Sequence, residues 1–286
     1  MKYAALATLP SPVPLGRRCA LLGVSRSGFY AWRQRPPSAR TQANRQLVAE
    51  IRRIHAAVDR TYGSPRMQPE LQARGLACGR HRIARLMRAH GIRAKQARRF
   101  RVTTDSRHGF AMAPNRLARA FTAAAPNRVW MGDVTYIPTG AGWCYLVVLV
   151  DAFSRRVVGW AVATQLTAAL PLRALERAVA HRRPAPGLLH HSDRGIQYAA
   201  TAYQGRLQQH GMISSMSRRG DCWDNAVVES FFASLKVERL HERRFVTPEQ
   251  VEAEVSDYIE RFYNRQRRHS TLGHDRPVVF ELRHVA

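Results

Sequence analysis

The segment that most constrains the fold is WCYLVVLVD (143–151), where apolar and aromatic residues run without a break up to Asp151. A strand that is apolar on both faces lies inside a sheet whose two sides are both covered. The segments 129–137 and 156–163 also have strand character, and only short turns separate them from this run. The sequence therefore predicts a three-stranded antiparallel meander with a buried central strand.

Alternating helix and strand patterns follow the meander. The expected order is helix 167–182, strand 187–193, helix 199–210, strand 212–217, and helices 224–240 and 248–264. This order predicts an α/β fold with a mixed five-stranded sheet and flanking helices. We assign residues 126–245 to this domain, and residues 246–286 to a C-terminal helix and basic tail packed on it.

The sequence predicts a helix-turn-helix-like segment over residues 1–38. Its start, 1–14, holds three prolines and no period, so we expect an irregular lead-in. Further on, Gly23 supplies a turn between two short helices, and Ser25 is placed to cap the second one. A helix-turn-helix protein presents such a helix to the major groove, so Ser25, Arg26 and Tyr30 are candidate DNA contacts.

A second all-α domain is expected over residues 39–95, with its last helix over 80–89. In that helix Arg80, Arg82 and Arg85 lie off the apolar stripe, which makes them candidate DNA contacts. The alternative is an ordinary solvated face. The very basic segment 96–125 is interpreted as an extended linker that follows nucleic acid.

The charge of the chain favours DNA as a partner. Lys and Arg number 46 against 20 Asp and Glu, so the formal net charge is +26. Such an excess repels itself unless a polyanion neutralises it, and double-stranded DNA does so with release of counterions. The alternatives are a membrane surface, or the arginine bias of a GC-rich genome, which would not explain the shortage of acids.

The sequence shows no pattern typical of a membrane or secreted protein. No apolar run approaches the roughly 18–20 residues that span a bilayer. The four cysteines are far apart and have no zinc-finger spacing. We therefore expect reduced thiols, a cytoplasmic location and no membrane partner.

Three carboxylates at the ends of expected elements are the candidate catalytic and metal-binding residues: Asp133, Asp193 and Glu229. Mg²⁺ prefers oxygen ligands, and a pair of such ions can activate a nucleophile and stabilise a leaving oxygen in phosphoryl transfer. Each acid alone could instead be structural: Asp193 could cap a turn, and Glu229 could pair with a nearby base. Asp151 is expected to cap the turn that follows it.

The helix that carries Glu229 predicts two further site residues. At about 100° per residue, Asn225 and Lys236 fall on the same stripe as Glu229, with Lys236 about 10 Å further along the axis. A basic group there suits a phosphate beside the metal ions. Arg194, next to Asp193, is a further candidate DNA contact. His190 and His191 are interpreted as structural, and Trp143 as a packing residue.

Several motifs together resemble OrfB transposases of the IS-three family of bacterial insertion sequences. They are HHSDRGIQY (190–198), SMSRRGDCWDNAVVESFFASLKVE (215–238), LLGVSRSGFYAWR (21–33) and YNRQRRHSTLGHDRP (263–277). Exactly 35 residues separate Asp193 from Glu229, as the D-35-E spacing of that family requires. The resemblance covers about residues 17–280.

The resemblance implies an RNase H-like core of the retroviral-integrase type and a DDE triad of Asp133, Asp193 and Glu229 that binds two Mg²⁺, with Mn²⁺ as a substitute. Lys236 resembles the basic residue that follows the Glu in the family and contacts DNA. The implied reaction is cleavage at the element ends, followed by attack of the freed 3′-OH on another phosphodiester.

The family also implies partners. These are the terminal repeats and target DNA, other copies of the chain assembled on DNA, and an upstream OrfA protein or an OrfAB fusion, in the bacterial cytoplasm at the nucleoid. Two alternatives remain open: a DNA-binding regulator or inactive copy without catalysis, and a metal-dependent nuclease that cleaves without joining strands.

Overall fold

The computed structural model describes residues 2–8, 10, 12–96, 112–218 and 222–285. The chain divides into two compact units, Met1–Ile51 and Arg52–Ala286. Half of the expected basic linker falls on residues 97–111, outside the described residues. Among the helices described, none is long and apolar enough to cross a membrane.

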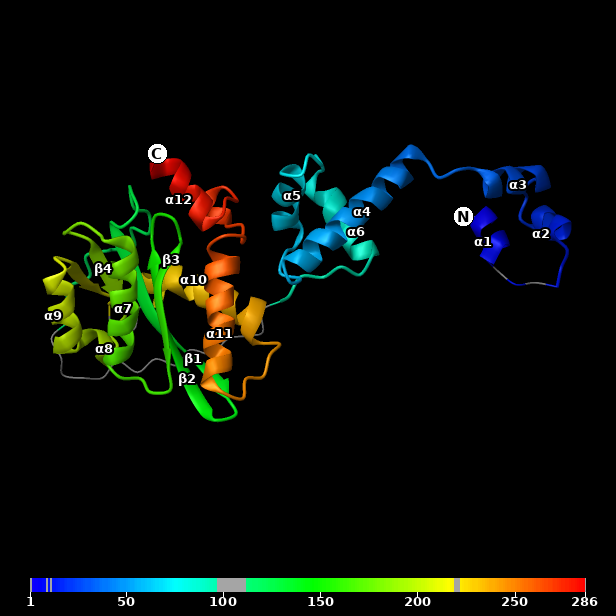
Figure 1. Cartoon of the computed structure of the whole chain (residues 1–286). Coiled ribbons are helices and arrows are strands. Elements are labelled where there is room, and N and C mark those ends of the chain that lie inside the picture. Colours follow the sequence, from blue (N-terminus) through cyan, green and yellow to red (C-terminus); the bar gives the residue numbers. More distant parts are fainter. Residues whose placement is uncertain (1, 9, 11, 97–111, 219–221, 286) are drawn as a thin grey trace. The chain divides into compact units, whose positions relative to one another are not determined.

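The first unit is helical. It comprises α1 (Lys2–Thr8), α2 (Leu15–Leu21), α3 (Arg26–Gln34) and the first part of α4 (Ala39–Ala57) (Figure 1). The expected turn and cap are confirmed, because Gly23 has a φ of +61° and the Ser25 side chain accepts a hydrogen bond from the Gly28 backbone N–H.

The prediction of an irregular lead-in over 1–14 is wrong for residues 2–8, which form α1. Leu6 of this helix is buried with Cys19 and Phe29 of the next two helices. Three short helices thus share one small core. A seven-residue segment gains little from its own helical propensity, so this packing provides the stabilisation that the local sequence pattern does not reveal.

The second unit begins with the rest of α4, followed by α5 (Ser64–Gln72) and α6 (Arg80–Ala89). The apolar spacing expected for these helices is confirmed, because Ile54 and Ile83 are fully buried. Helix α5 begins at Ser64 and has Pro65 in its first turn. Proline is tolerated there because the first turn of a helix has no use for that N–H.

A five-stranded sheet forms the centre of the second unit. Its strands are β1 (Val129–Thr139), β2 (Gly142–Asp151), β3 (Val157–Ala163), β4 (Leu189–Ser192) and β5 (Ile213–Met216), in the order β3-β2-β1-β4-β5. The first three strands are antiparallel, while β4 runs parallel to β1 and β5 parallel to β4. The predicted meander and the mixed sheet are confirmed.

Helices cover the sheet and carry the chain between strands (Figure 1). Helix α7 (Ala169–Arg182) packs on β2 and β3, and α10 (Ala226–Leu235) packs on β1 and β2. Strand β2 is buried at every position from Leu146 to Asp151, as its uninterrupted apolar pattern predicts. Helices α8 (Ile196–Ala199) and α9 (Thr201–Gln209) connect β4 to β5.

The two long helices expected near the C-terminus are interrupted. The first consists of a 3₁₀ turn η1 (Cys222–Asn225), α10, and a π-helical turn η2 (Lys236–Leu240). The second is α11 (Pro248–Ser256) followed by the π-helical η3 (Asp257–Tyr263). A short turn, η4 (Ser270–Leu272), and a helix, α12 (Pro277–Val285), form the segment expected as a basic tail.

Candidate active site

Two of the three predicted carboxylates follow paired positions on neighbouring parallel strands. Gly132 of β1 is in register with Ser192 of β4, so Asp133 and Asp193 each come one residue later. Neighbouring strands lie about 4.8 Å apart, which places the two residues side by side at the end of the β1–β4 pair. The strand pairing thus brings together two acids that are 60 positions apart in the sequence.

Burial and neighbouring charge together raise the pKa of Asp133 well above its usual range. Burial is the larger cause, and the carboxylates of Asp193 and Glu229 add to it. A hydrogen bond of 2.8 Å from the Val134 backbone N–H, and the charge of Lys236, act in the opposite direction. The four charged side chains are therefore near enough to interact, as predicted from the sequence.

Helix α10 carries Glu229 past the end of these strands. Val228, Phe232 and Leu235 are buried, as the helix periodicity predicts, while Glu229 is exposed. Partial burial nevertheless raises the pKa of Glu229. The carboxylate lies at the edge of the buried face of α10, on the helix that packs against β1.

Asn225 does not lie on the Glu229 stripe, because it precedes the first residue of α10. Its side chain is buried and its Nδ2 donates a hydrogen bond of 3.2 Å to the Gly132 carbonyl oxygen. Gly132 directly precedes Asp133. The structure therefore places Asn225 between the start of α10 and β1, and not at the surface where DNA would contact it.

Lys236 is half-buried at the start of η2. Burial lowers the pKa of its ammonium group, and the charge of Asp133 partly offsets that effect. The predicted proximity of Lys236 to the carboxylates is therefore present, although a π-helical turn begins at this residue.

The donor set suits a hard divalent cation. The acids supply oxygen ligands, and a bound cation would relieve the repulsion that adds to burial in raising the pKa of Asp133. Among the residues that the structure describes, no group of three His, Cys, Asp or Glu side chains is close enough to form a complete set of metal ligands. The charges of Asp193 and Glu229 act on Asp133, but the three carboxylates are not close enough to one another to form a complete metal site.

Asp193 and Asp151 both accept hydrogen bonds from turns. Asp193 accepts a hydrogen bond of 2.9 Å from the Gly195 backbone N–H through Oδ1, which is the turn-capping contact considered as an alternative role. Asp151 is fully buried and accepts the backbone N–H groups of Phe153 and Asn127, at 2.8 and 2.7 Å. Asp151 therefore caps a turn, as predicted.

The adjacent histidines are structural. His190 shares a hydrogen bond of 2.9 Å with the Tyr203 hydroxyl, and His191 shares one of 2.9 Å with the Ser215 hydroxyl. Both rings are buried, and burial lowers their pKa values to about 3 and about 4. Both therefore stay neutral near pH 7 and tie β4 to its neighbours.

Asp224 was not among the predicted site residues, although it lies in the motif at 215–238. Its carboxylate is buried and accepts hydrogen bonds from the side chains of Asn115, Arg119 and Arg218. These bonds tie the segment before the sheet to η1, where the helix of Glu229 begins. The presence of an acid beside several arginines in an acid-poor chain is the signal that could have identified it.

The candidate DNA contacts are mostly at the surface. Ser25, Arg26 and Tyr30 are exposed on α3, and Arg80 and Arg85 are exposed on α6, where Arg82 is half-buried. Arg194 donates from Nε to the Ser217 carbonyl oxygen at 2.7 Å. Trp143 is 57% exposed, and its ring packs in a T-shaped contact with Tyr136 at the end of the β1–β2 hairpin.

Comparison with known proteins covers nearly the whole chain. A family model described as an HTH-like domain matches residues 42–100, and two described as integrase core domains match 123–222 and 210–277. An uncharacterized 31 kDa protein of insertion element IS600 from Shigella sonnei is 45% identical over 92% of this chain and 96% of its own length. Transposase InsF for insertion sequence IS3A of Escherichia coli is 39% identical, and the match covers 100% of both chains. A solved HTLV-2 integrase catalytic core domain, in its trimeric form, is 17% identical with a TM-score of 0.43, over 55% of this chain and 98% of that one.

Proposed function

Because this chain belongs to the IS3 family of insertion-sequence transposases, with an HTH-like domain and an integrase core, we propose that it cuts phosphodiester bonds at the ends of its element and joins the freed 3′-OH to another DNA strand. The catalytic residues in this proposal are Asp133, Asp193 and Glu229. The family acts on DNA, and the integrase core makes it a polynucleotidyl transferase.

The observation that carries the proposal is the pairing of β1 with β4, which sets Asp133 and Asp193 side by side while α10 brings Glu229 to the same end of the sheet. This arrangement offers oxygen ligands from three separate elements. Asn225, bonded to Gly132, ties the start of α10 to β1 beside Asp133.

These three carboxylates would hold two Mg²⁺ ions, with Mn²⁺ as a substitute. When bound, the ions stabilise the charge of the attacking and leaving oxygens in the displacement. The chain itself positions the scissile phosphate with Lys236, and Arg194 lies beside Asp193 where it can hold the neighbouring phosphate. His190 and His191, both neutral and buried, keep β4 fixed while this occurs.

The DNA partner follows from the candidate contacts on α3 and α6. Arg80, Arg82 and Arg85 on α6, and Ser25, Arg26 and Tyr30 on α3, would bind the terminal repeat, since short basic helices in such domains lie against the duplex. Like its family, the chain would act as several copies on bacterial DNA, in the cytoplasm, together with OrfA or an OrfAB fusion.

A strand-transfer assay tests the proposal. The full chain is incubated with Mg²⁺ and labelled DNA bearing the element ends, beside the Glu229→Gln variant. Joined products that vanish in the variant would support the transposase function. Nicks without joining would favour a nuclease, and binding without either product would favour a regulator. A variant that still joins strands would remove Glu229 from the catalytic set.

A further inference from the structure

A buried carboxylate, Glu238, lies at the end of the catalytic helix and has no part in the proposed triad. It belongs to η2, two residues after Lys236, and is only 4% exposed. A charged group this far from solvent needs several partners to compensate for its lost hydration. The partners show what holds this turn in place.

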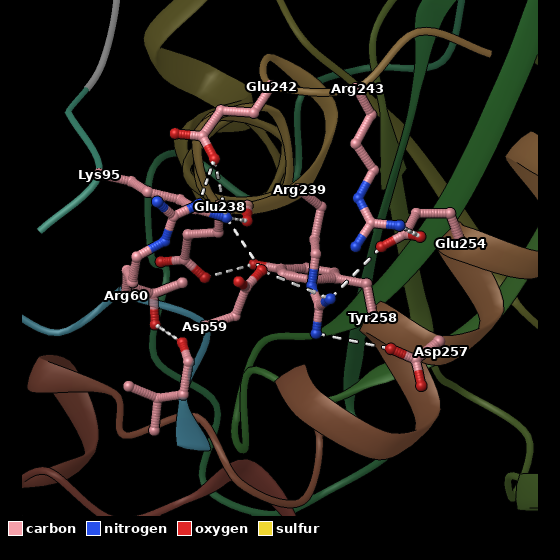
Figure 2. Close-up of polar contacts among 12 residues, drawn as sticks. Asp59, Arg60, Lys95, Glu238, Arg239, Glu242, Arg243, Glu254, Asp257 and Tyr258 are labelled. Carbon is pink, nitrogen blue, oxygen red and sulfur yellow. Dashed lines mark hydrogen bonds and ion pairs between the residues drawn. The ribbon is translucent and has the colours of Figure 1, made fainter. Parts of the chain in front are cut away.

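The side chain of Glu238 is saturated with donors. Arg267 binds it through Nε at 3.0 and 2.8 Å and through Nη2 at 2.8 Å. The Tyr258 hydroxyl donates to Oε2 at 2.8 Å (Figure 2). Arg66 donates from Nη1 to Oε1 at 3.3 Å.

The backbone of the same residue is also engaged. Lys95 donates from Nζ to the Glu238 carbonyl oxygen at 2.8 Å and pairs with Asp59 at 2.9 Å (Figure 2). The side chain of Lys95 is only 8% exposed. Glu238 is therefore bound through both its side chain and its main chain.

These partners come from different parts of the second unit. Arg66 lies on α5 and Lys95 follows α6, so both belong to the segment matched by the HTH-like domain. Tyr258 and Arg267 belong to the C-terminal part of the integrase core. Further bonds join the same segments: Arg268 pairs with Glu70 at 2.6 Å, and the Tyr62 hydroxyl donates to the Gln266 carbonyl at 3.1 Å.

The same turn carries Lys236. A π-helical turn inside an α-helix is a costly local geometry that persists where function or packing requires it. Here Lys236 opens the turn and Glu238 lies at its middle, so a shift of Glu238 moves Lys236 directly. Helix α6, with its exposed arginines, packs on α5, which carries Arg66.

We propose that Glu238 is a positioning residue that links the HTH-like domain to the catalytic helix: by binding Arg66 and Lys95 it holds η2 so that Lys236 meets the DNA phosphate when the helical domain engages the duplex. This inference rests on the proposed function, in which Lys236 contacts a phosphate. It adds a route by which binding at α6 orients a group at the active site.

Equilibrium binding of end DNA across a salt series tests this link without relying on turnover. The logarithm of affinity falls with the logarithm of salt concentration by about 0.9 for each phosphate contacted, so losing the Lys236 contact reduces the slope by about one. We expect Glu238→Gln to reduce the slope by about one, like Lys236→Ala, and the double variant to show no larger reduction than either alone. Removal of a carboxylate cannot itself remove a phosphate contact, so the change reports displacement of Lys236.

A neighbouring carboxylate provides the matched control. Glu242 pairs with Arg60 at 3.1 Å and Lys95 at 3.5 Å, but its side chain is 51% exposed and it lies beyond η2 (Figure 2). Glu242→Gln should keep the wild-type slope. The same reduction in both variants would mean that any lost carboxylate near Lys95 has this effect, and would overturn the specific role of Glu238.

A second variant serves if Glu238→Gln does not fold. Arg66→Met leaves the buried Glu238–Arg267 pair intact and removes only a contact from the HTH-like domain. It should reduce the slope by about one, and its combination with Lys236→Ala should reduce it no further. A reduction of about two in that double variant would show that Arg66 binds a phosphate itself, and would overturn the link.

The test separates failure of the inference from failure of the proposed function. An unchanged slope in Glu238→Gln, together with a reduced slope in Lys236→Ala, overturns the link and leaves the DNA contact in place. An unchanged slope in Lys236→Ala overturns both the inference and the phosphate contact on which it rests.

Discussion

Replacing Asp224 by asparagine should destabilise the second unit and displace the start of α10, the helix that carries Glu229. The Asp224 carboxylate is fully buried and accepts hydrogen bonds from Asn115 at 2.8 Å, Arg119 at 3.1 Å and the Arg218 backbone N–H at 2.9 Å. In the variant an NH₂ group replaces one oxygen and faces these donors, and the negative charge is lost.

The size of the loss in stability depends on how well water can replace the hydrogen bonds to Asp224. A hydrogen bond to a charged group contributes about 1.5–3 kcal/mol to stability. The arginine side chains are 46% and 54% exposed, so water can solvate them when the charge is removed, and their contribution lies at the low end. We expect Asp224→Asn to lower the free energy of unfolding by about 2–3 kcal/mol at pH 7. Most of this loss comes from the buried Asp224 position and not from the arginines.

The pH dependence gives a sharper test. Hydrogen bonds from Arg218, opposed by burial, hold the pKa of Asp224 below its usual range in the folded protein. Its contribution is therefore present above the unfolded pKa of about 3.9 and is lost as the pH falls toward the folded pKa. Below about pH 4, the stability gap between wild type and variant should narrow by about 1.4 kcal/mol per pH unit.

Chemical denaturation from pH 7 to pH 3 measures both quantities on the full chain. Asp275→Asn is the matched control, because Asp275 also pairs with an arginine, Arg283, but that arginine side chain is 63% exposed. Its loss should cost less than about 1 kcal/mol. A stability for Asp224→Asn equal to that of wild type, or a gap that stays constant below pH 4, would refute the argument.

Four further outcomes are expected. Asp133→Asn and Asp193→Asn should each abolish cleavage in a cleavage assay, because the proposed role of both carboxylates is to hold the metal ions. End-DNA affinity measured by gel shift should stay within about twofold of wild type. Cleavage retained by either variant would exclude that residue from the triad. Ca²⁺ in place of Mg²⁺ should support binding without cleavage, because its coordination is looser, and brisk cleavage in Ca²⁺ would contradict a two-Mg²⁺ site. Gly159→Ala should lower the free energy of unfolding by about 1–3 kcal/mol, because the added Cβ would overlap the Ala174 carbonyl oxygen where α7 crosses β3. An unchanged melting temperature in thermal unfolding would contradict that packing. Arg85→Ala should reduce the salt slope of DNA binding by about one, and an unchanged slope would place α6 away from the phosphates.

Local patterns were enough to predict much of the fold. The unbroken apolar run of β2, the short turns on either side of it and the helical spacing of Ile51, Ile54 and Ile83 each depend on residues close together in the chain. Side-chain periodicity is a property of a single strand or helix, so it can be seen without a structure. The position of Asp193 directly after β4 was predictable for the same reason, whereas Asp133 lies inside β1, which continues to Thr139.

Resemblance to a family supplied the prediction of a triad, because the motifs around Asp193 and Glu229 are specific in combination. It did not predict the roles of neighbours within those motifs. Asn225, expected as a DNA contact, is buried against Gly132, and Asp224, in the same motif, binds a segment more than 100 positions away. A motif identifies which residues recur together but not which of them face solvent.

Sequence alone determined the identity and order of the strands, and the position of Asp193 directly after one of them, because each is encoded by neighbours in the chain. Only the tertiary structure decided that α1 is a helix packed on Phe29, that β1 and β4 pair in register, and that Glu238 is bound by Arg66 and Arg267. Each of these depends on contacts between residues distant in sequence. Such contacts form only when the sheet and helices are assembled, since burial then makes an unsatisfied charge or an exposed apolar side chain costly.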